Sequence, residues 1–279
     1  QAQLRTSNNW MMDEPRLLLQ DFVNDPHNYV SIMRAIADGN QSLSEISKRI
    51  GLTGGSTSKY LGVLRDTGFV ERDVPVTKRG TESRQGRYFV TDPYLRFYYR
   101  FLSTYQSKLA LGQQGQMLAE IENDLPDFIA TNTWREMCRD WVLLAGEIEK
   151  LPVNVTEIGG EWKRSFSIDI AGLNHNQKTL VLGNCDWEND LSVSEILDDL
   201  VKRTATLLPD DGTDWSVYFL AFSVVNWTEK DREDAQTAFD QLAINSRGRR
   251  NWTPTGFRLV DLTEVDSDLT AWSVNVVIE

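Results

Sequence analysis

Polar side chains on two neighbouring predicted strands have the types that could hold a metal ion. The stretch FSIDIAGLNHNQKTLVLGNCDW, residues 166–187, has the pattern of two β-strands joined by a polar turn. Asp169 lies on the first strand, and Asn184 and Asp186 share one face of the second because side chains alternate along a strand. Carboxylate and amide oxygens are ligands of Mg²⁺. Asp169 and Asp186 therefore form a weak candidate metal site of the kind that metal-dependent nucleases use.

The same residues argue against hydrolysis. Cleavage of a phosphodiester develops negative charge, which a cation in the site must stabilise. Asp186 would place a second negative charge at that point. We therefore assign no catalytic residue. We interpret Glu161, Lys163 and Arg164, in the neighbouring stretch GEWKRSF, as an exposed strand edge of mixed charge.

Histidine and cysteine provide no other catalytic centre. His27 and His175 are far apart and next to no nucleophile motif, so we expect both at the surface. Cys138 and Cys185 lack CxxC spacing and have apolar neighbours, which predicts buried, reduced thiols rather than a zinc site or a disulfide.

A second group of residues could bind an anion. Between Asn40 and Ser103, eleven Lys and Arg residues outnumber six Asp and Glu residues. This excess of +5 lies in a chain of net charge −12, so the remainder carries −17. Such an asymmetry indicates one anion-facing surface. The predicted DNA contacts are Ser56, Thr57, Ser58, Lys59, Lys78, Arg79, Arg84 and Arg87.

The elements that position these residues form a winged helix-turn-helix pattern. Apolar residues at helical spacing predict a helix that stops at Gly39, and Ser42 with Glu45 forms a capping box for the next. A third helix begins after Gly54 and Gly55, and the runs FVERDVPV and RYFVTD then predict two strands joined by a polar loop. In this motif the third helix enters the major groove and the wing cations meet phosphates.

The rest of the chain predicts a second, α/β domain. A stripe of Tyr94, Phe97, Tyr98 and Phe101 at helical spacing is expected to join the two domains. After residue 130, strands alternate with helices, which is typical of an α/β sandwich, and GFRLVDLTEV is expected to be the final strand. The predicted fold class is α+β overall.

Composition is consistent with a soluble protein of two domains. The chain has 279 residues, of which 41% are hydrophobic and 25% charged. No apolar run approaches the ~20 residues that a membrane-spanning helix needs. The first residues have no secretory pattern. We expect a cytoplasmic protein without a membrane partner.

Three stretches closely resemble the C-terminal half of the archaeal-type AAA+ (DEXX-box) ATPases with a DUF234 region. They are YVSIMRAIADGNQSLSEISKRIGL, KYLGVLRDTGFVERDVPVT and GRYFVTDPYLRFYYRF. The resemblance spans roughly residues 10–210. Family members begin with a P-loop module, which this sequence does not contain. The resemblance therefore implies a fragment or a shortened relative that has no cofactor of its own, with ATP and Mg²⁺ bound only through that module.

The last domain of the resembled family is similar to the PD-(D/E)XK restriction endonucleases. Their magnesium site uses a helix glutamate, a strand aspartate and an E-x-K pair. Asp169 matches the aspartate, whereas Asn184 and Asp186 stand in place of the E-x-K pair. Arg135 stands where the helix glutamate is expected, unless Glu136 replaces it by a one-residue shift. The resemblance thus implies a degenerate nuclease site.

The predicted organisation has four parts, and three functions stay open. Residues 1–25 are expected to end a lid or linker, 26–92 to form the winged helix-turn-helix, 93–130 a helical connector and 131–279 the nuclease-like domain. The main hypothesis is a DNA-binding, scaffolding portion of an ATPase, with double-stranded DNA and its own or a separate ATPase module as partners. The alternatives are an active Mg-dependent nuclease and a protein-interaction module. A homo-oligomer is also left open.

Overall fold

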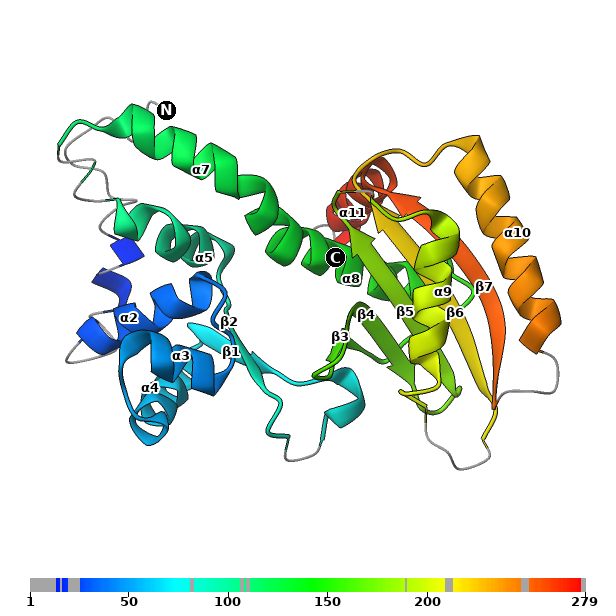
Figure 1. The fold of residues 1–279 in the computed structure, drawn as a ribbon, viewed down its shortest axis with the longest axis horizontal. Helices are drawn as coiled ribbons and strands as arrows, with labels where there is room; N and C mark the ends of the chain where they lie inside the picture. The colour runs from blue at the N-terminus through cyan, green and yellow to red at the C-terminus, as the bar shows by residue number, and fades with distance from the viewer. Residues whose placement is uncertain are drawn as a thin grey trace. The chain divides into compact units, whose positions relative to one another are not determined.

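A computed structural model describes residues 14–15, 17–19, 26–80, 83–105, 108, 111–188, 190–208, 213–246 and 251–276. The chain divides into two compact units (Figure 1). The first consists of residues 1–74 and 82–126, and the second of residues 75–81 and 127–279. Most of the predicted linker segment 1–25 lies outside the described residues. The fold class is α+β, as predicted.

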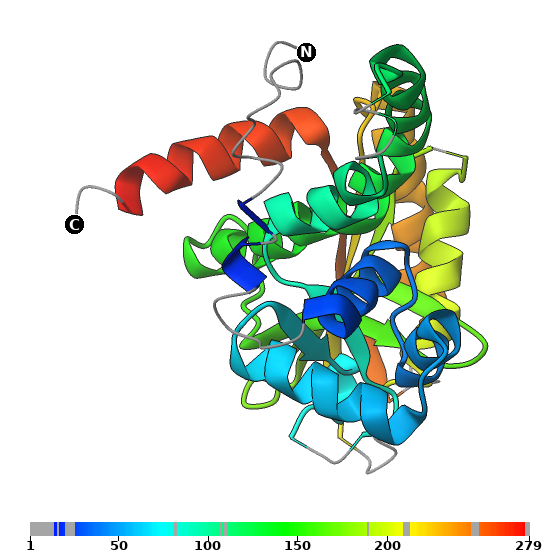
Figure 2. The ribbon, with the colours of Figure 1, turned by 90° about the vertical axis from the view of Figure 1, so that its left-hand side faces the viewer.

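The first unit contains the three predicted helices and a two-stranded wing. Its helices and strands are α2 (Pro26–Ala37), α3 (Leu43–Ile50), α4 (Gly54–Asp66), β1 (Val70–Asp73), β2 (Arg87–Val90), α5 (Pro93–Arg100), the short η2 (Leu102–Thr104) and most of α7 (Gln114–Ile129). In Figure 2, α2 to α4 run from blue to light blue and pack against one another.

Local signals in the sequence account for the ends of these helices. The Ser42 side chain accepts a hydrogen bond from the Glu45 N–H, and Glu45 Oε2 accepts one from the Ser42 N–H at 2.9 Å, which confirms the capping box. Helix α3 ends at Gly51, whose φ of 73° lies in the left-handed region that glycine adopts without strain. Thr53 caps α4 with its hydroxyl, which accepts a hydrogen bond from the Ser56 N–H.

The aromatic helix buries a face that differs from the predicted stripe, and its role as a joint between the domains stays a prediction. Helix α5 packs on α2 and β2 within the first unit. Its buried face includes Leu95, Arg96, Tyr98 and Tyr99 and is only partly the predicted stripe. Arg96 adopts this face because its Nε donates a hydrogen bond to the Val90 carbonyl at 3.1 Å, which satisfies a buried charge locally.

The wing is shorter than its sequence predicted. Strands β1 and β2 pair antiparallel from Val70 opposite Val90 to Asp73 opposite Arg87. The apolar residues that follow, Pro75 and Val76, were expected to extend the first strand. They instead lie in and beside the single-turn helix η1 (Val76–Lys78), which belongs to the second unit.

The second unit is a mixed five-stranded sheet between two layers of helices (Figure 1). The strands, in spatial order, are β3 (Glu157–Trp162), β4 (Ser167–Asn174), β5 (Thr179–Asp186), β6 (Trp215–Ser223) and β7 (Trp252–Asp261). The first three are antiparallel, and β5, β6 and β7 run parallel. The two predicted strands within residues 166–187 are therefore confirmed.

Each face of the sheet has its own apolar core. Helices α9 (Val193–Thr204) and α10 (Glu229–Ser246) cover one face, and α8 (Arg135–Glu147) and α11 (Leu262–Val276) cover the other. Helix α8 continues α7 through the π-helical turn η3 (Ala130–Trp134). The stretch GFRLVDLTEV contributes to the last strand, as predicted, but its final four residues begin α11. Strand β7 stops at Asp261, whose carboxylate accepts a hydrogen bond from the Glu264 N–H at the start of that helix. Among the described residues, no helix is long and apolar enough to span a membrane.

Candidate functional site

The exposed face of α4 consists of small and cationic side chains. Gly55, Ser58 and Lys59 are exposed, and Gly62 lies one turn further along on the same side. This is the helix that a helix-turn-helix protein places in the major groove. Its small side chains would let the helix backbone approach the base edges closely.

The glycines of this face have no visible role inside the protein. Gly54, Gly55 and Gly62 adopt ordinary helical φ values, and a Cβ added to any of them would meet no atom within 4 Å. Glycine inside a helix costs about 1 kcal/mol relative to alanine. The helix therefore carries a stability cost that neither backbone conformation nor internal packing explains.

One of the predicted contact residues on α4 is wrong. Thr57 is fully buried, and its hydroxyl donates a hydrogen bond to the Thr53 carbonyl at 3.0 Å. It faces the helical core because it lies one position from the exposed Ser58. Ser56 is half-buried, and its hydroxyl accepts a hydrogen bond from Thr53.

The predicted wing cations divide between the two units. Arg84 and Arg87 lie in the first unit, where the positive charge of Arg87 contributes to lowering the pKa of Glu45, after the larger effect of the hydrogen bonds from Ser42. Lys78 and Arg79 lie in residues 75–81, which we call the wing tip and which form part of the second unit. The four residues do not make one free cationic loop.

A buried glutamate holds the wing tip. Glu161 of β3 is 1% exposed, and its two carboxylate oxygens accept hydrogen bonds from the Thr77 N–H and hydroxyl, both at 3.1 Å. Val76 is buried in the core between the sheet and α9 and α10. The interpretation of Glu161 as part of an exposed strand edge was wrong, because the wing tip covers it. Lys163 and Arg164 are exposed as predicted.

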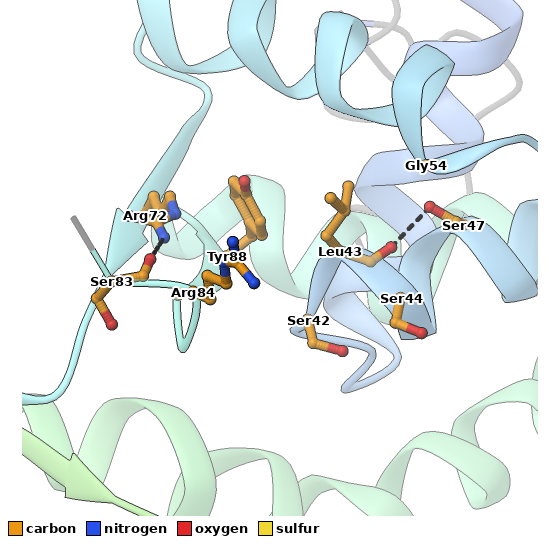
Figure 3. A pocket seen from close by; sticks show the side chains of 10 residues that line it. Ser42, Leu43, Ser44, Ser47, Gly54, Arg72, Ser83, Arg84 and Tyr88 are labelled. Atoms are coloured by element: carbon orange, nitrogen blue, oxygen red, sulfur yellow. Dashed lines mark hydrogen bonds between the residues drawn. The ribbon is translucent and has the colours of Figure 1, made fainter.

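An open pocket of about 690 Å³ lies in the first unit between α3, the start of α4 and the wing (Figure 3). Arg72 and Arg84 line the wing side, and Ser42 and Ser44 line the side of α3. The residues that line it include no carboxylate. Arg84 was predicted as a wing cation from the sequence, whereas Arg72 was missed because its position depends on strand pairing.

In the second unit, both carboxylate oxygens of Asp169 contact other protein groups, whereas a catalytic carboxylate needs its oxygens free. Its Oδ1 lies 2.9 Å from Arg135 Nε of α8, and its Oδ2 accepts a hydrogen bond from the Cys185 N–H at 3.2 Å. Arg139 donates two hydrogen bonds to its main-chain carbonyl. Arg135, which stands where the resemblance expects a glutamate, thus places a guanidinium beside the aspartate.

A bulge in β4 turns Asp169 toward α8. Two residues of β4, Asp169 and Ile170, lie between Ile168 and Ala171, whereas one residue of β3, Gly160, lies between their partners Glu161 and Gly159. Ile168 and Ala171 both face α9 and α10, so the alternation of inward and outward side chains is broken between them. Asp169 consequently contacts α8.

The partner strand keeps a regular alternation. Cys185 packs in the core next to α8, so Asn184 and Asp186 lie on the other side of β5, which α9 and α10 cover. Asn184 Oδ1 is buried and accepts no hydrogen bond within the described residues. Cys138 and Cys185 are buried free thiols, as predicted, and burial raises the pKa of Cys138, with further contributions from Cys185 and Asp169.

These positions do not fit a magnesium ion. The nearest charge to Asp169 is the Arg135 guanidinium, which would repel a divalent cation. In the part of the chain that the structure describes, no three or more His, Cys, Asp or Glu side chains gather closely enough to hold a metal. We therefore derive no metal-dependent step.

Comparison with known proteins identifies two regions. The IclR helix-turn-helix domain matches residues 28–74, which span α2 to β1. DUF234, a family described as archaea bacterial proteins of unknown function, matches residues 98–198, from α5 to the first half of α9. These matches support the helix-turn-helix and DUF234 parts of the predicted resemblance, but not the AAA+ ATPase part.

A distant relative matches three quarters of the chain. An uncharacterised protein of Methanocaldococcus jannaschii is 26% identical over 211 residues, which are 75% of this chain and 47% of that protein. The chain thus matches about half the length of this relative. No solved structure matches the chain.

Proposed function

We propose that the first unit binds double-stranded DNA with α4 in the major groove. The observation that carries the proposal is the exposed face of α4, where Gly55 and Gly62 flank Ser58 and Lys59 without an internal reason for the glycines. The match to an IclR helix-turn-helix domain supports the same surface. The contact residues are then Ser56, Ser58 and Lys59 on α4, with Arg84 and Arg87 from the wing.

Binding of this kind is electrostatic and depends on salt. Log K falls as log salt concentration rises, and each phosphate contact that is lost makes this slope less steep by about 0.9. We expect Lys59→Ala to weaken binding of duplex DNA and to reduce this slope, as measured by fluorescence anisotropy. Lys202→Ala, which removes an exposed lysine of α9 in the second unit, is the matched control. Equal affinity and slope in both variants would exclude α4 from the interface.

Lys78 and Arg79 need a separate variant because their segment belongs to the second unit. A double alanine variant at these two positions tests whether the anchored wing tip also contacts DNA. If the folded wild-type chain binds no duplex at any salt concentration, the DNA-binding proposal fails, and the protein-interaction module is the hypothesis to test next.

We also propose that the second unit does not cleave DNA and acts as a scaffold. The Arg135 guanidinium on Asp169 supports this proposal, as do Asn184 and Asp186 in place of an acid and a lysine. The test is nicking of supercoiled DNA with Mg²⁺ or Mn²⁺, using Asp169→Ala to exclude a contaminating nuclease. Metal-dependent nicking that disappears in this variant would establish the alternative, an active nuclease.

The scaffold is proposed to serve an ATPase of the resembled family. The relative from Methanocaldococcus jannaschii leaves room for such a module, since only 47% of its length is matched. We expect the unmatched part of that relative, produced by itself, to hydrolyse ATP and this chain not to. The absence of ATP hydrolysis by the unmatched part would remove the ATPase from the proposal.

A further inference from the structure

The wing pocket of the first unit, lined by Arg72, Arg84, Ser42 and Ser44, contains a cation that is fixed in place. Arg72 Nη2 donates a hydrogen bond to the Ser83 carbonyl at 2.5 Å (Figure 3). Its guanidinium also lies directly over Gly86, where an added Cβ would clash with Arg72 Cζ. Gly86 has no positive φ, so its backbone conformation does not require glycine. The glycine instead provides the space in which Arg72 sits.

The described residues that line this pocket include two arginines and no acid. Within the described residues, neither Arg72 nor Arg84 forms an ion pair, although their side chains line the same cavity. Glu71 and Asp73 flank Arg72 on β1 but do not line the pocket, and Glu45 of α3 already accepts a hydrogen bond from the Ser42 N–H. Two arginines without carboxylate partners, opposite serine hydroxyls, provide the donors that a phosphate group requires.

The lining is not only polar. Leu43 and the largely buried Tyr88 contribute apolar surface between the arginines and the serines (Figure 3). The volume of about 690 Å³ exceeds that of a phosphate and falls in the range of small-molecule sites. The ligand therefore has an apolar or planar part as well as its anionic group, which describes a nucleotide.

We propose that the wing pocket binds a nucleotide through its phosphate, held by Arg72 and Arg84 with hydrogen bonds from Ser42 or Ser44. The nucleotide is either part of a bound DNA strand or free in solution, because both present the same phosphate and base chemistry. In the first case the inference rests on the proposed DNA-binding function, and in the second it stands independently.

The test uses the full chain with two probes, AMP and duplex DNA of mixed sequence. The variants are Arg84→Gln, which removes the unpaired charge, and Gly86→Ala, which displaces Arg72 without changing the net charge. Lys48→Gln is the matched control, because it removes an exposed cation of α3 that does not line the pocket. Thermal unfolding of each variant identifies any that fails to fold, and Arg72→Gln is then used in its place.

Two results would support the site and distinguish its ligands. AMP binding by calorimetry, lost about tenfold in both pocket variants but not in Lys48→Gln, identifies a free nucleotide. No AMP binding, with DNA affinity and salt slope reduced only in the pocket variants, identifies a nucleotide of the DNA strand.

Two other results would overturn the inference. If the pocket variants match Lys48→Gln with both probes while Lys59→Ala still weakens DNA binding, the DNA-binding proposal stands and the pocket fails. If wild-type protein binds neither AMP nor duplex DNA, both proposals fail.

Discussion

At the scale of single residues, the contact between Thr77 and Glu161 joins two segments that lie far apart in the sequence. A carboxylate that is 1% exposed has both oxygens satisfied by a residue 84 positions away in the sequence. A buried charge that loses such a partner remains desolvated without compensation. The pair therefore fixes the wing tip to β3 more firmly than an exposed contact of the same length would.

We expect Thr77→Val to lower the free energy of unfolding by about 1–3 kcal/mol, because it leaves one oxygen of Glu161 buried without its hydroxyl donor. Glu161→Gln removes the charge and also destabilises. In the double variant the two losses should be less than additive, since both remove the same contact. Urea unfolding of the four proteins measures this coupling, and strict additivity would show that the contact does not form.

The capping residue Glu45 predicts a dependence on pH. Hydrogen bonds from the backbone and side chain of Ser42 lower its pKa below 4.5. The folded state thus favours the carboxylate, so its stabilisation is present above pH 4.5 and is lost as the pH falls through the lowered value.

Glu45→Gln should therefore unfold at lower urea concentration than the wild type at pH 7. Screening by solvent limits the difference to about 0.3 kcal/mol. The gap should close as the pH falls below 4.5. Glu122→Gln, an exposed change on α7, is the reference. A gap that widens in acid would mean that folding favours the protonated form of Glu45 instead.

At the scale of elements, α4 combines helix formation with a surface that weakens it. Gly62→Ala should stabilise the first unit by about 1 kcal/mol, because alanine favours a helix and no atom lies within 4 Å of the new Cβ. The same change should weaken DNA binding, since the methyl group separates the helix from the base edges. Anisotropy titration and thermal unfolding measure the two effects.

Gly115→Ala on α7 is the matched comparison for this prediction. It is also an exposed helical glycine with no atom near its Cβ position, but it lies outside the proposed interface. It should gain stability without changing DNA affinity. If Gly62→Ala behaves in the same way, the glycines of α4 do not serve DNA contact.

Local signals predicted most of the elements, and long-range contacts account for the rest. Capping residues and terminal glycines act within a few positions, so the helices of the first unit could be read from the sequence. The positions of Pro75 and Val76 could not be predicted in this way, because Val76 packs in a core formed by residues after position 160. The same holds for the bulge that turns Asp169 toward α8, since a register shift arises only when β3 and β4 pair.

The candidate sites show the same division. Ser58, Lys59 and Arg84 were predicted from charge and motif alone, and all three are exposed. Thr57 was wrong because a shift of one position moves a helical side chain from the surface to the core. Arg72 was missed because its space is created by Gly86, which only the closed wing brings next to it.

At the scale of the whole molecule, each unit contains a segment whose neighbours in the sequence belong to the other. Residues 75–81 lie in the second unit, although both flanking strands belong to the first. Val76→Asp should therefore destabilise β3 and β4 rather than α2, α3 and α4, because it places a charge in the core of the second unit. Hydrogen exchange measured by mass spectrometry would locate the faster-exchanging peptides.

Lys78→Asp provides the comparison, because it places a negative charge in the same turn at an exposed position outside the core. It should leave hydrogen exchange in β3 and β4 close to that of the wild type. Faster exchange confined to the three helices of the first unit in Val76→Asp would show that the wing tip does not belong to the second core.

The shared wing tip also constrains how such a chain can change during evolution. A single genetic crossover between α7 and α8 would join the helix-turn-helix of one protein to the sheet of another. The core of that sheet would then receive a residue from the other protein at position 76, and Glu161 would face a different residue at position 77. Exchange of the DNA-reading part among relatives would need either matching changes at both places or two crossovers that leave residues 75–81 behind. The two units should therefore be inherited together.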